Sequence, residues 1–313
     1  MRSPITTRPP RGVALMAVLW LIAILSMACM VALRVITFDL EIAAAKIHGS
    51  RARQVAEMGI ALGCNPAVKR SDPLLTRIDK ETDESFQVRI MSEGGRFDIN
   101  YLILNKDEEL LRSIFIYWGL ELKDAQAVTS ALTDWVDAND ETQLNGAEKK
   151  DYEKVGRINQ PFNRPFYHVE EISLVRGMDF VESLRPNWRD WFTIWSSGPL
   201  DLNEAPAELI AVAADVSLAE AEEIPKKICG IDGIRNTEDD TPFESPAAAL
   251  AILGKNPDDQ TSSVTRFAAS LQDSTTRIES TGTAEGATRK ITVIVKNRTG
   301  KPALLDRTEE IIP

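Results

Sequence analysis

The sequence predicts an α+β fold in which a long N-terminal helix packs on a small antiparallel sheet that carries a large all-α insertion. Three patterns carry this expectation. Residues 13–62 follow a helical pattern that begins apolar and becomes amphipathic. Residues 102–177 are again helical and are broken by loops. Residues 276–282 and 289–296 alternate apolar and polar side chains, as antiparallel strands do.

The N-terminal helix is predicted to begin in a membrane. Val13–Leu33 is a run of about 21 residues without a charge, enough to span a bilayer core of about 30 Å. Positive charge before this run keeps the N-terminus in the cytoplasm, and the run follows Arg2, Arg8 and Arg11. A cleaved secretory signal is the rival interpretation, but the helical pattern continues to the stop signals at Gly63, Asn65 and Pro66. One helix of about 50 residues, roughly 75 Å long, is therefore expected.

The elements after this helix are shorter. Residues 65–84 are polar and rich in turn residues, which predicts a connection. Phe86–Ile90 and Arg96–Asn100 are predicted to be strands of a small antiparallel sheet that packs against the long helix. Residues 191–202 are also predicted to form a strand. The closing hairpin is followed by a charged tail after Asn297 that we expect to be loose. Helices are expected over 124–136, 170–175, 203–214, 218–228, 246–253 and 262–270.

A weak repeat links two segments that precede helical patterns. Gly94–Asn100 and Ser197–Asn203 share the pattern Gly-x-x-Asp-apolar-Asn. Asn is a good helix cap because its side chain accepts a hydrogen bond from an N–H two or three residues on. The repeat is therefore interpreted as strand-to-cap geometry, with no chemistry assigned to it.

Charge and cysteine content narrow the classes of function. The formal net charge of −11 over 313 residues argues against nucleic acid as a partner, because phosphate binding needs clustered Lys and Arg. It is compatible with hard cations held by carboxylates, although a solvated acidic surface without a ligand is the preferred interpretation of the bulk charge. Cys29 is expected in lipid. Cys64 and Cys229 fit no metal-ligand spacing, and the sequence leaves open whether they pair in an oxidising compartment.

The most acidic segment is Leu132–Tyr152. Its carboxylates would repel one another unless they were solvated or neutralised, and it also contains Asn139 and Asn145. Ca²⁺ takes six to eight oxygen ligands of the kinds that this loop supplies. The alternating acidic positions of an EF-hand are missing. The rival interpretation is that these acids cap helices and face solvent.

A second acidic loop covers residues 231–240. Its cation-binding candidates are Asp232, Asn236, Glu238, Asp239 and Asp240. Asp, Asn and Gly also favour turns, so a solvated turn is an equal alternative.

The start of the chain resembles type IV pilin and pseudopilin precursors. Gly12-Val13 joins a short basic leader to the apolar helix, as at the prepilin peptidase site of those families, where cleavage after the Gly keeps the helix. Ala17 stands at the fifth mature position, where most such proteins carry Glu. That departure is typical of the K-type minor pseudopilins of type II secretion (general secretion pathway protein K), and it suits a subunit with no partner above it.

The acidic segment is similar to the Asp-Trp-(Ile/Val)-Asp … Gly-Ala-Glu … Tyr signature of the same family. The matching residues are Asp134, Trp135, Asp137, Asp140, Gly146, Ala147, Glu148 and Tyr152. Asp201–Ala213 resembles the family's Asn-x-Asn-x-Ala-Pro segment, although Asp201 replaces the first Asn. Glu170–Met178 resembles its Glu-Leu-x-x-Val-x-Gly stretch. The resemblance thus covers nearly the whole chain.

The resemblance implies a pseudopilin fold with a large α insertion. The expected divisions are a leader over 1–12, a transmembrane and assembly helix over 13–64, an α+β body over 65–101 and 190–313, and an insertion over 102–189 or to about 270. It also implies calcium in the insertion. The expected ligands are Asp134, Asp137, Asp140 and Glu148, with Glu141 and Asn145 as further candidates.

The implied role is structural. The resemblance predicts a subunit at the tip of the secretion pseudopilus that assembles with I-type and J-type minor pseudopilins and supports export across the outer membrane. It would be processed by prepilin peptidase, cross the bacterial inner membrane once and place its C-terminal domain in the periplasm.

No enzyme is expected. His48 and His168 are the only histidines, and no nucleophile elbow, phosphate-binding Gly loop or His-rich metal motif is present. Two rival functions stay open. A minor pilin of a type IV pilus would be distinguished by loss of twitching rather than secretion on deletion. A membrane-anchored periplasmic hydrolase would lose turnover when Asp134 or Asp137 is changed.

Overall fold

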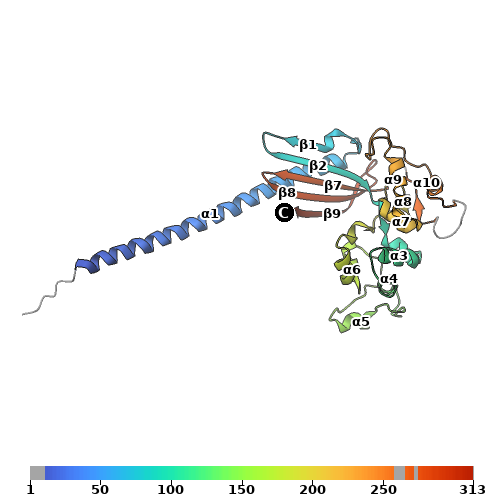
Figure 1. Ribbon diagram of the computed structural model, residues 1–313, viewed down its shortest axis with the longest axis horizontal. Coiled ribbons are helices and arrows are strands. Elements are labelled where there is room, and N and C mark those ends of the chain that lie inside the picture. The colour runs from blue at the N-terminus through green and yellow to red at the C-terminus, as the bar shows by residue number, and fades with distance from the viewer. Residues whose placement is uncertain (1–10, 257–264, 271–273, 313) are drawn as a thin grey trace, which may run out of the picture.

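Helix α1 dominates the shape of the molecule. The computed structural model describes residues 11–256, 265–270 and 274–312, and the expected leader residues 1–10 lie outside them. α1 (Arg11–Cys64) is a single rod of 54 residues, about 80 Å long at 1.5 Å per residue. Its first half projects away from the rest of the chain (Figure 1), and the apolar side chains from Val13 to Leu40 are exposed there. The predicted long helix is confirmed.

Five antiparallel strands form the main sheet, in the order β1-β2-β7-β8-β9. They are β1 (Thr76–Asp79), β2 (Glu84–Ser92), β7 (Thr275–Ala284), β8 (Ala287–Lys296) and β9 (Ala303–Ile312). Alternation along the strands aims one face at the C-terminal half of α1. On β2, for example, Phe86, Val88 and Ile90 are buried in that layer. At Gly282 the helix comes so close that an added Cβ would overlap the backbone of Ala52 and Ala56.

The end of α1 is held by an arginine from near the other end of the chain. Arg298, in the turn between β8 and β9, is 6% exposed. Its guanidinium donates to the backbone carbonyls of Gly63 at 2.6 Å, Asn65 at 3.1 Å and Val68 at 2.5 Å. Carbonyls at a helix C-terminus lack intrahelical partners, and a cation there complements the helix dipole. The hairpin therefore fixes where α1 stops.

Two predictions about the sheet are wrong. The tail after Asn297 is not loose, because β9 pairs with β8 along its length. Its side chains are mostly exposed and give no hydrophobic alternation, so backbone pairing and ion pairs of Arg307 with Glu57 and of Arg53 with Glu309 dock it instead. The connection over 65–84 contains an edge strand, β1, which is likewise exposed.

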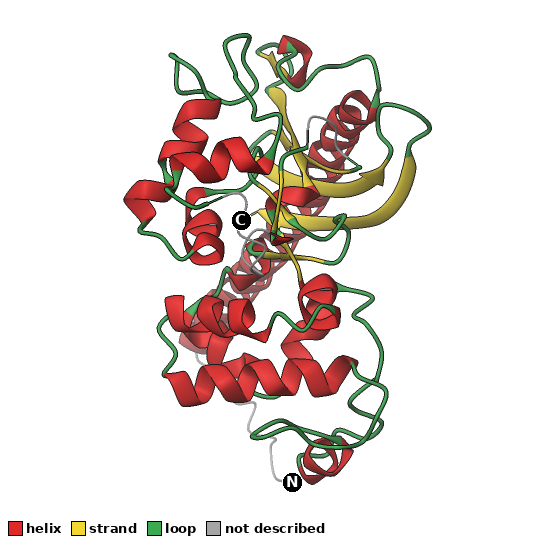
Figure 2. Ribbon diagram, turned by 90° about the vertical axis from the view of Figure 1, so that its right-hand side faces the viewer, coloured by secondary structure: helices red, strands yellow, loops and turns green. Residues whose placement is uncertain are grey.

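The helical part of the chain lies beside and below the sheet in Figure 2. It also contains two short parallel pairs, of β3 (Phe97–Asp98) with β4 (Phe192–Thr193) and of β5 (Leu200–Asp201) with β6 (Phe267–Ala268). Its helices are α2 (Ile99–Leu104), α3 (Glu108–Tyr117), α4 (Leu122–Val136), α5 (Lys149–Lys154), α6 (Met178–Leu184), α7 (Ala207–Ala214), α8 (Leu218–Ala221), α9 (Glu223–Ile228) and α10 (Pro246–Ile252).

Three further element predictions are corrected here. The strand expected over 96–100 is only β3, and it lies outside the main sheet. The strand expected over 191–202 is split into β4 and β5 by a turn in which Gly198 has a φ of +116°. A helix is expected over 262–270, but its described part contains the strand β6 instead, and residues 262–264 lie outside the described residues.

Buried apolar side chains form two clusters. The smaller one lies between α1 and the main sheet. The larger one fills the helical part around Phe115, Trp135, Trp188 and Phe192, and it continues as far as Phe267. Burial of each such side chain contributes about 1.5–3 kcal/mol. The cluster also includes Phe97 and Ile99 from the expected body, so where the insertion begins and ends stays a prediction.

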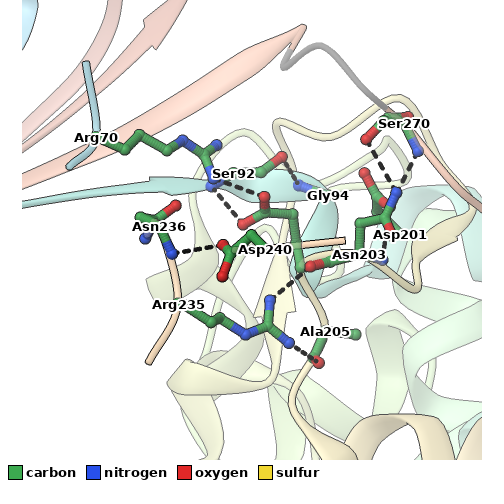
Figure 3. A network of polar contacts seen from close by, with 11 residues as sticks. Arg70, Ser92, Gly94, Asp201, Asn203, Ala205, Arg235, Asn236, Asp240 and Ser270 are labelled. Carbon is green, nitrogen blue, oxygen red and sulfur yellow. Dashed lines mark hydrogen bonds and ion pairs between the residues drawn. The ribbon is translucent and has the colours of Figure 1, made fainter. Parts of the chain in front are cut away.

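The repeated Asn residues do not cap helices, contrary to the prediction. The carboxylate of Asp98 caps α2 by accepting from the Tyr101 N–H. Asn100 instead exchanges two hydrogen bonds with the backbone of Phe166, at 2.8 and 2.9 Å. Asn203 does the same with Phe243, also at 2.8 and 2.9 Å, close to Asp201 and Ser270 in Figure 3. Each Asn therefore fixes a buried Phe from a distant loop.

Candidate metal centre

Two buried carboxylates face the inside of the acidic loop. Asp134 lies near the end of α4, where it is fully buried beside Trp135. Glu148 lies at the start of α5 and is 3% exposed. The ring of Trp135 packs against Tyr152 at 5.3 Å and Phe162 at 5.2 Å between centroids, so the helix end has little freedom to move.

These carboxylates are poorly compensated. Both oxygens of Asp134 accept from the Gln143 N–H at 3.2 Å. Both oxygens of Glu148 are buried without a close hydrogen-bond partner, although the side chain faces the first-turn N–H groups of α5 in a capping box with Asp151. An unpaired ionised group costs several kcal/mol when it is taken out of water.

The titration of the pair reflects that cost. Burial raises the pKa of Asp134 to about 6, and repulsion from Asp137 and Asp151 adds to the rise. Burial also raises the pKa of Glu148 to about 7, followed by repulsion from Asp134, Asp137 and Asp140. The four expected ligands are thus close enough to act on one another electrostatically.

The loop supports its acids with internal turns. Asp137 accepts from the Asn139 N–H at 3.1 Å, and Asn139 accepts in turn from the Glu141 N–H at 2.7 Å. Asn145 has a φ of +67°, which marks it as a turn residue. Among the residues that the structure describes, no three His, Cys, Asp or Glu side chains are gathered closely enough to hold a metal. The ligand roles of all six candidates therefore stay predictions: Asp134, Asp137, Asp140, Glu148, Glu141 and Asn145.

An asparagine that the sequence did not single out joins the loop. Asn163 donates to the backbone carbonyl of Asn139 at 3.3 Å and to the carboxylate of Asp140 at 3.4 Å. Its own side-chain oxygen is buried without a partner. Its φ of +50° is typical of Asn in a turn, so the sequence signal was for a turn rather than for a ligand.

The glycine and tyrosine of the signature have packing roles. A Cβ on Gly146 would overlap the Asp134 carboxylate. The Gly146 carbonyl accepts from the Arg176 guanidinium at 3.1 Å, and the Tyr152 hydroxyl accepts from the Arg176 N–H at 3.2 Å. These contacts hold the loop in place against the carboxylate of Asp134.

The fit to calcium rests on the orphaned oxygens. Carboxylate and amide oxygens are the ligands that Ca²⁺ prefers, and a divalent cation would neutralise the two acids whose pKa values are raised. Asp134, Glu148 and Asn163 present the buried oxygens, while Asp137 and Asp140 are the neighbouring carboxylates.

The second acidic loop is internally satisfied. Asp239 accepts from the N–H groups of Ile231 at 2.7 Å and Asp232 at 3.2 Å. Asp240 accepts from the Asn236 N–H at 2.6 Å, and Glu238 is exposed. This is the geometry of a self-capped turn, and a cation there stays a prediction.

The remaining sequence candidates lie on or near α1. Gly12, Val13 and Ala17 fall in its first turns, and the side chain of Val13 is 61% exposed. Their processing and assembly roles stay predictions. Cys64 and Cys229 are both free thiols, the first beside the helix–sheet cluster and the second buried.

Comparisons with known proteins agree on one family. The family described as type II secretion system (T2SS), protein K matches residues 95–187. A type II secretion system protein K of Dickeya chrysanthemi is 35% identical over 71 residues, which are 23% of this chain and 19% of that protein. One of Pseudomonas aeruginosa PAO1 is 25% identical over 169 residues, 50% of this chain and 47% of that protein. The matches thus span less than half the length of these relatives.

The fold extends the likeness beyond the matched sequence. The structure described as the GspK-GspI-GspJ complex from the enterotoxigenic Escherichia coli type 2 secretion system contains a chain that is 12% identical, with a TM-score of 0.57. The match covers 88% of this chain and 98% of that one, so the two share one α+β fold. The matched domain, the relatives and the shared fold together make this chain similar to type II secretion system protein K over residues 95–187 and in its overall fold.

Proposed function

We propose that this chain is the minor pseudopilin at the tip of a type II secretion pseudopilus. In this role it assembles with I-type and J-type minor pseudopilins, initiates the pseudopilus and supports protein export across the outer membrane. It is a structural subunit and not an enzyme. The related solved structure is a GspK-GspI-GspJ complex, which supports this choice of partners.

The observation that carries the proposal is the division of α1 into two halves. The apolar first half has no protein around it, and its most hydropathic window is wholly unburied. The second half is packed on the main sheet through Val55, Ala56 and Ile60. A helix of this kind can be stored in the inner membrane as a single-pass anchor and can later pack with the same helices of other subunits.

The proposal includes processing by prepilin peptidase after Gly12. Mature protein would then begin at Val13 and keep the whole apolar run. The absence of a carboxylate at Ala17 would deny it a partner above, which suits a terminal position. The folded part would lie in the periplasm.

Calcium is proposed as a structural ion of the acidic loop. The buried oxygens of Glu148, which lack a close hydrogen-bond partner, support this, as does the burial of Asp134 beside them. When bound, the ion would neutralise the pair and hold loop 137–148 against α4. In this proposal the acidic residues bind the ion and orient the loop, and they carry out no catalytic step.

Two measurements test the proposed role. Intact mass of the protein purified from a host with prepilin peptidase should correspond to a chain that begins at Val13, and a start at Met1 or near Ala32 would contradict it. Deletion of the gene should block secretion, and the intact chain should restore it. Restoration by a chain that lacks residues 13–33 would contradict the anchored role.

A further inference from the structure

A cleft rich in arginine lies along residues 88–92 of β2. This arginine cleft has a volume of about 430 Å³. Its charged lining residues are Arg70, Arg89, Arg96, Arg235 and Arg277, with the carboxylates Asp190 and Glu204. The chain as a whole has a net charge of −11, so the sign of the local charge is reversed in this cleft.

The arginines reach the cleft from separate segments. Because Val88 and Ile90 of β2 face α1, Arg89 between them faces outward. Arg277 is outward on β7 for the same reason. Arg70 follows the end of α1 and extends toward Ser92, and Arg235 lies in the second acidic loop and extends toward the backbone of Asn203 and Ala205 (Figure 3).

Some of these cations already have acidic partners. Arg70 pairs with Glu204 at 2.6 Å, and Arg277 pairs with the buried Glu93 at 2.5 Å. These two arginines therefore stabilise the fold, and their charges are largely neutralised by these carboxylates.

The other three make no direct ion pair, although Glu93, Asp190 and Glu279 stabilise the charge of Arg96 from a distance and Arg89 lies opposite Glu279 across the sheet. Arg235 donates only to the backbone carbonyls of Asn203 and Ala205. Among the described residues, no carboxylate lies within ion-pair distance of Arg89, Arg96 or Arg235. Burial lowers the pKa of Arg96, and repulsion from Arg277 lowers it further. An incoming anion would relieve that repulsion.

The cleft continues along the sheet. A second hollow of about 460 Å³ shares Arg96 and Arg277 with the first and has β7, β8 and β9 as its floor. At the β9 end its lining includes Asp306 and Glu310. The floor thus runs from a cationic end at β2 to an acidic end at β9.

The length of this floor distinguishes between kinds of ligand. Three spacings of about 4.8 Å separate β2 from β9, so the floor is about 14 Å long. That is the reach of about four extended residues. A free phosphate would contact a single point of the cationic end, whereas the carboxylates of an extended acidic segment would contact several arginines there and would avoid the acidic β9 end.

We propose that the arginine cleft binds an extended acidic segment of a partner protein, whose carboxylates lie against Arg89, Arg96 and Arg235. The guanidinium fork matches a carboxylate in two hydrogen bonds, which gives both affinity and orientation. This interaction surface is independent of the tip position proposed above.

Binding of a labelled hexaglutamate peptide tests the proposal. The full-length chain in neutral detergent is titrated by fluorescence anisotropy at low and at high salt. We expect saturable binding that weakens as salt is added. The double variant Arg89→Gln/Arg235→Gln should bind about tenfold more weakly, and the single variant Arg89→Gln, on an exposed sheet face, about threefold.

A matched control removes the same charge elsewhere. Lys123 and Lys227 are exposed on other helices, and the variant Lys123→Gln/Lys227→Gln should bind as the unchanged chain does. The proposal is overturned by absence of saturable binding, or by equal weakening in this control. Displacement of the peptide by inorganic phosphate, at a phosphate concentration equal to that of the peptide's carboxylates, would also overturn the proposal. The site would then be one for small anions.

Discussion

Replacement of Glu148 by glutamine is expected to change stability in opposite directions with and without calcium. Glutamine keeps the shape of the side chain and removes the charge. Both oxygens of Glu148 lack a close hydrogen-bond partner, and the nearby Asp134 is also buried. Without a cation the native carboxylate opposes folding, whereas with a cation it is a ligand.

The magnitude follows from the pKa of Glu148, which is raised from 4.5 to about 7. The folded protein binds a proton there that the unfolded protein releases, so stability falls as pH rises from 4.5 to 7 and stays lower above 7. At about 1.4 kcal/mol per pH unit, the ionised carboxylate costs up to about 3 kcal/mol. At pH values above 7, in chelator, Glu148→Gln should therefore be more stable than the native chain by up to about that amount.

Calcium should reverse the order of stability. The native chain should gain stability from the ion, because ligand binding to the folded state adds to its stability. The variant lacks one charged ligand and should gain less. Thermal unfolding of the full-length chain in detergent, with chelator and with calcium, measures both cases.

The matched control is Glu153→Gln, an exposed change on the same helix. It should be nearly neutral in both conditions. If Glu148→Gln destabilises the chain equally with and without calcium, the account of an uncompensated buried acid is wrong.

Three other predictions concern the loop and the hairpin. In chelator the native chain should melt at a lower temperature at pH 8 than at pH 5, because the raised pKa of Asp134 opposes ionisation, and calcium should remove the difference; equal melting at both pH values would contradict this. Gly146→Ala should weaken calcium binding, measured by calorimetry, and destabilise the loop by about 1–3 kcal/mol, because the added methyl group overlaps the carboxylate of Asp134. Unchanged calcium affinity would refute this prediction. Arg298→Ala should lower the free energy of unfolding by about 2–4 kcal/mol, measured by chemical denaturation, because buried carbonyls lose their hydrogen-bond donor. Arg307→Ala breaks a more exposed ion pair and should lower it by less than about 1 kcal/mol. Similar losses in the two variants would argue against helix capping.

The parts of the fold that were predictable are those with a strong apolar pattern. The unbroken run from Val13 predicted α1, and the alternation over 289–296 predicted β8, although residues 291–295 of β8 are buried on both faces. β9 has no such pattern, since its side chains are mostly exposed and its pairing is through the backbone. Long-range capping by Arg298 gives no local signal at all.

The candidate site shows the same limit. Crowded acids predicted the loop, and the structure adds which of them are buried: Asp134 and Glu148 rather than Glu141. Asn163 lies in another loop, so only the fold brings its side-chain nitrogen near the carboxylate of Asp140. The repeated Asn residues, 100 and 203, were misread because their Phe partners lie far away in sequence.

Co-purification tests the central claim most directly. The full-length chain would be produced together with the I-type and J-type minor pseudopilins of its own secretion system, with an affinity tag on the J-type subunit. A single complex that contains all three chains is predicted. Recovery of the I-type and J-type subunits together, with this chain left behind at the same expression level, would contradict its place at the tip.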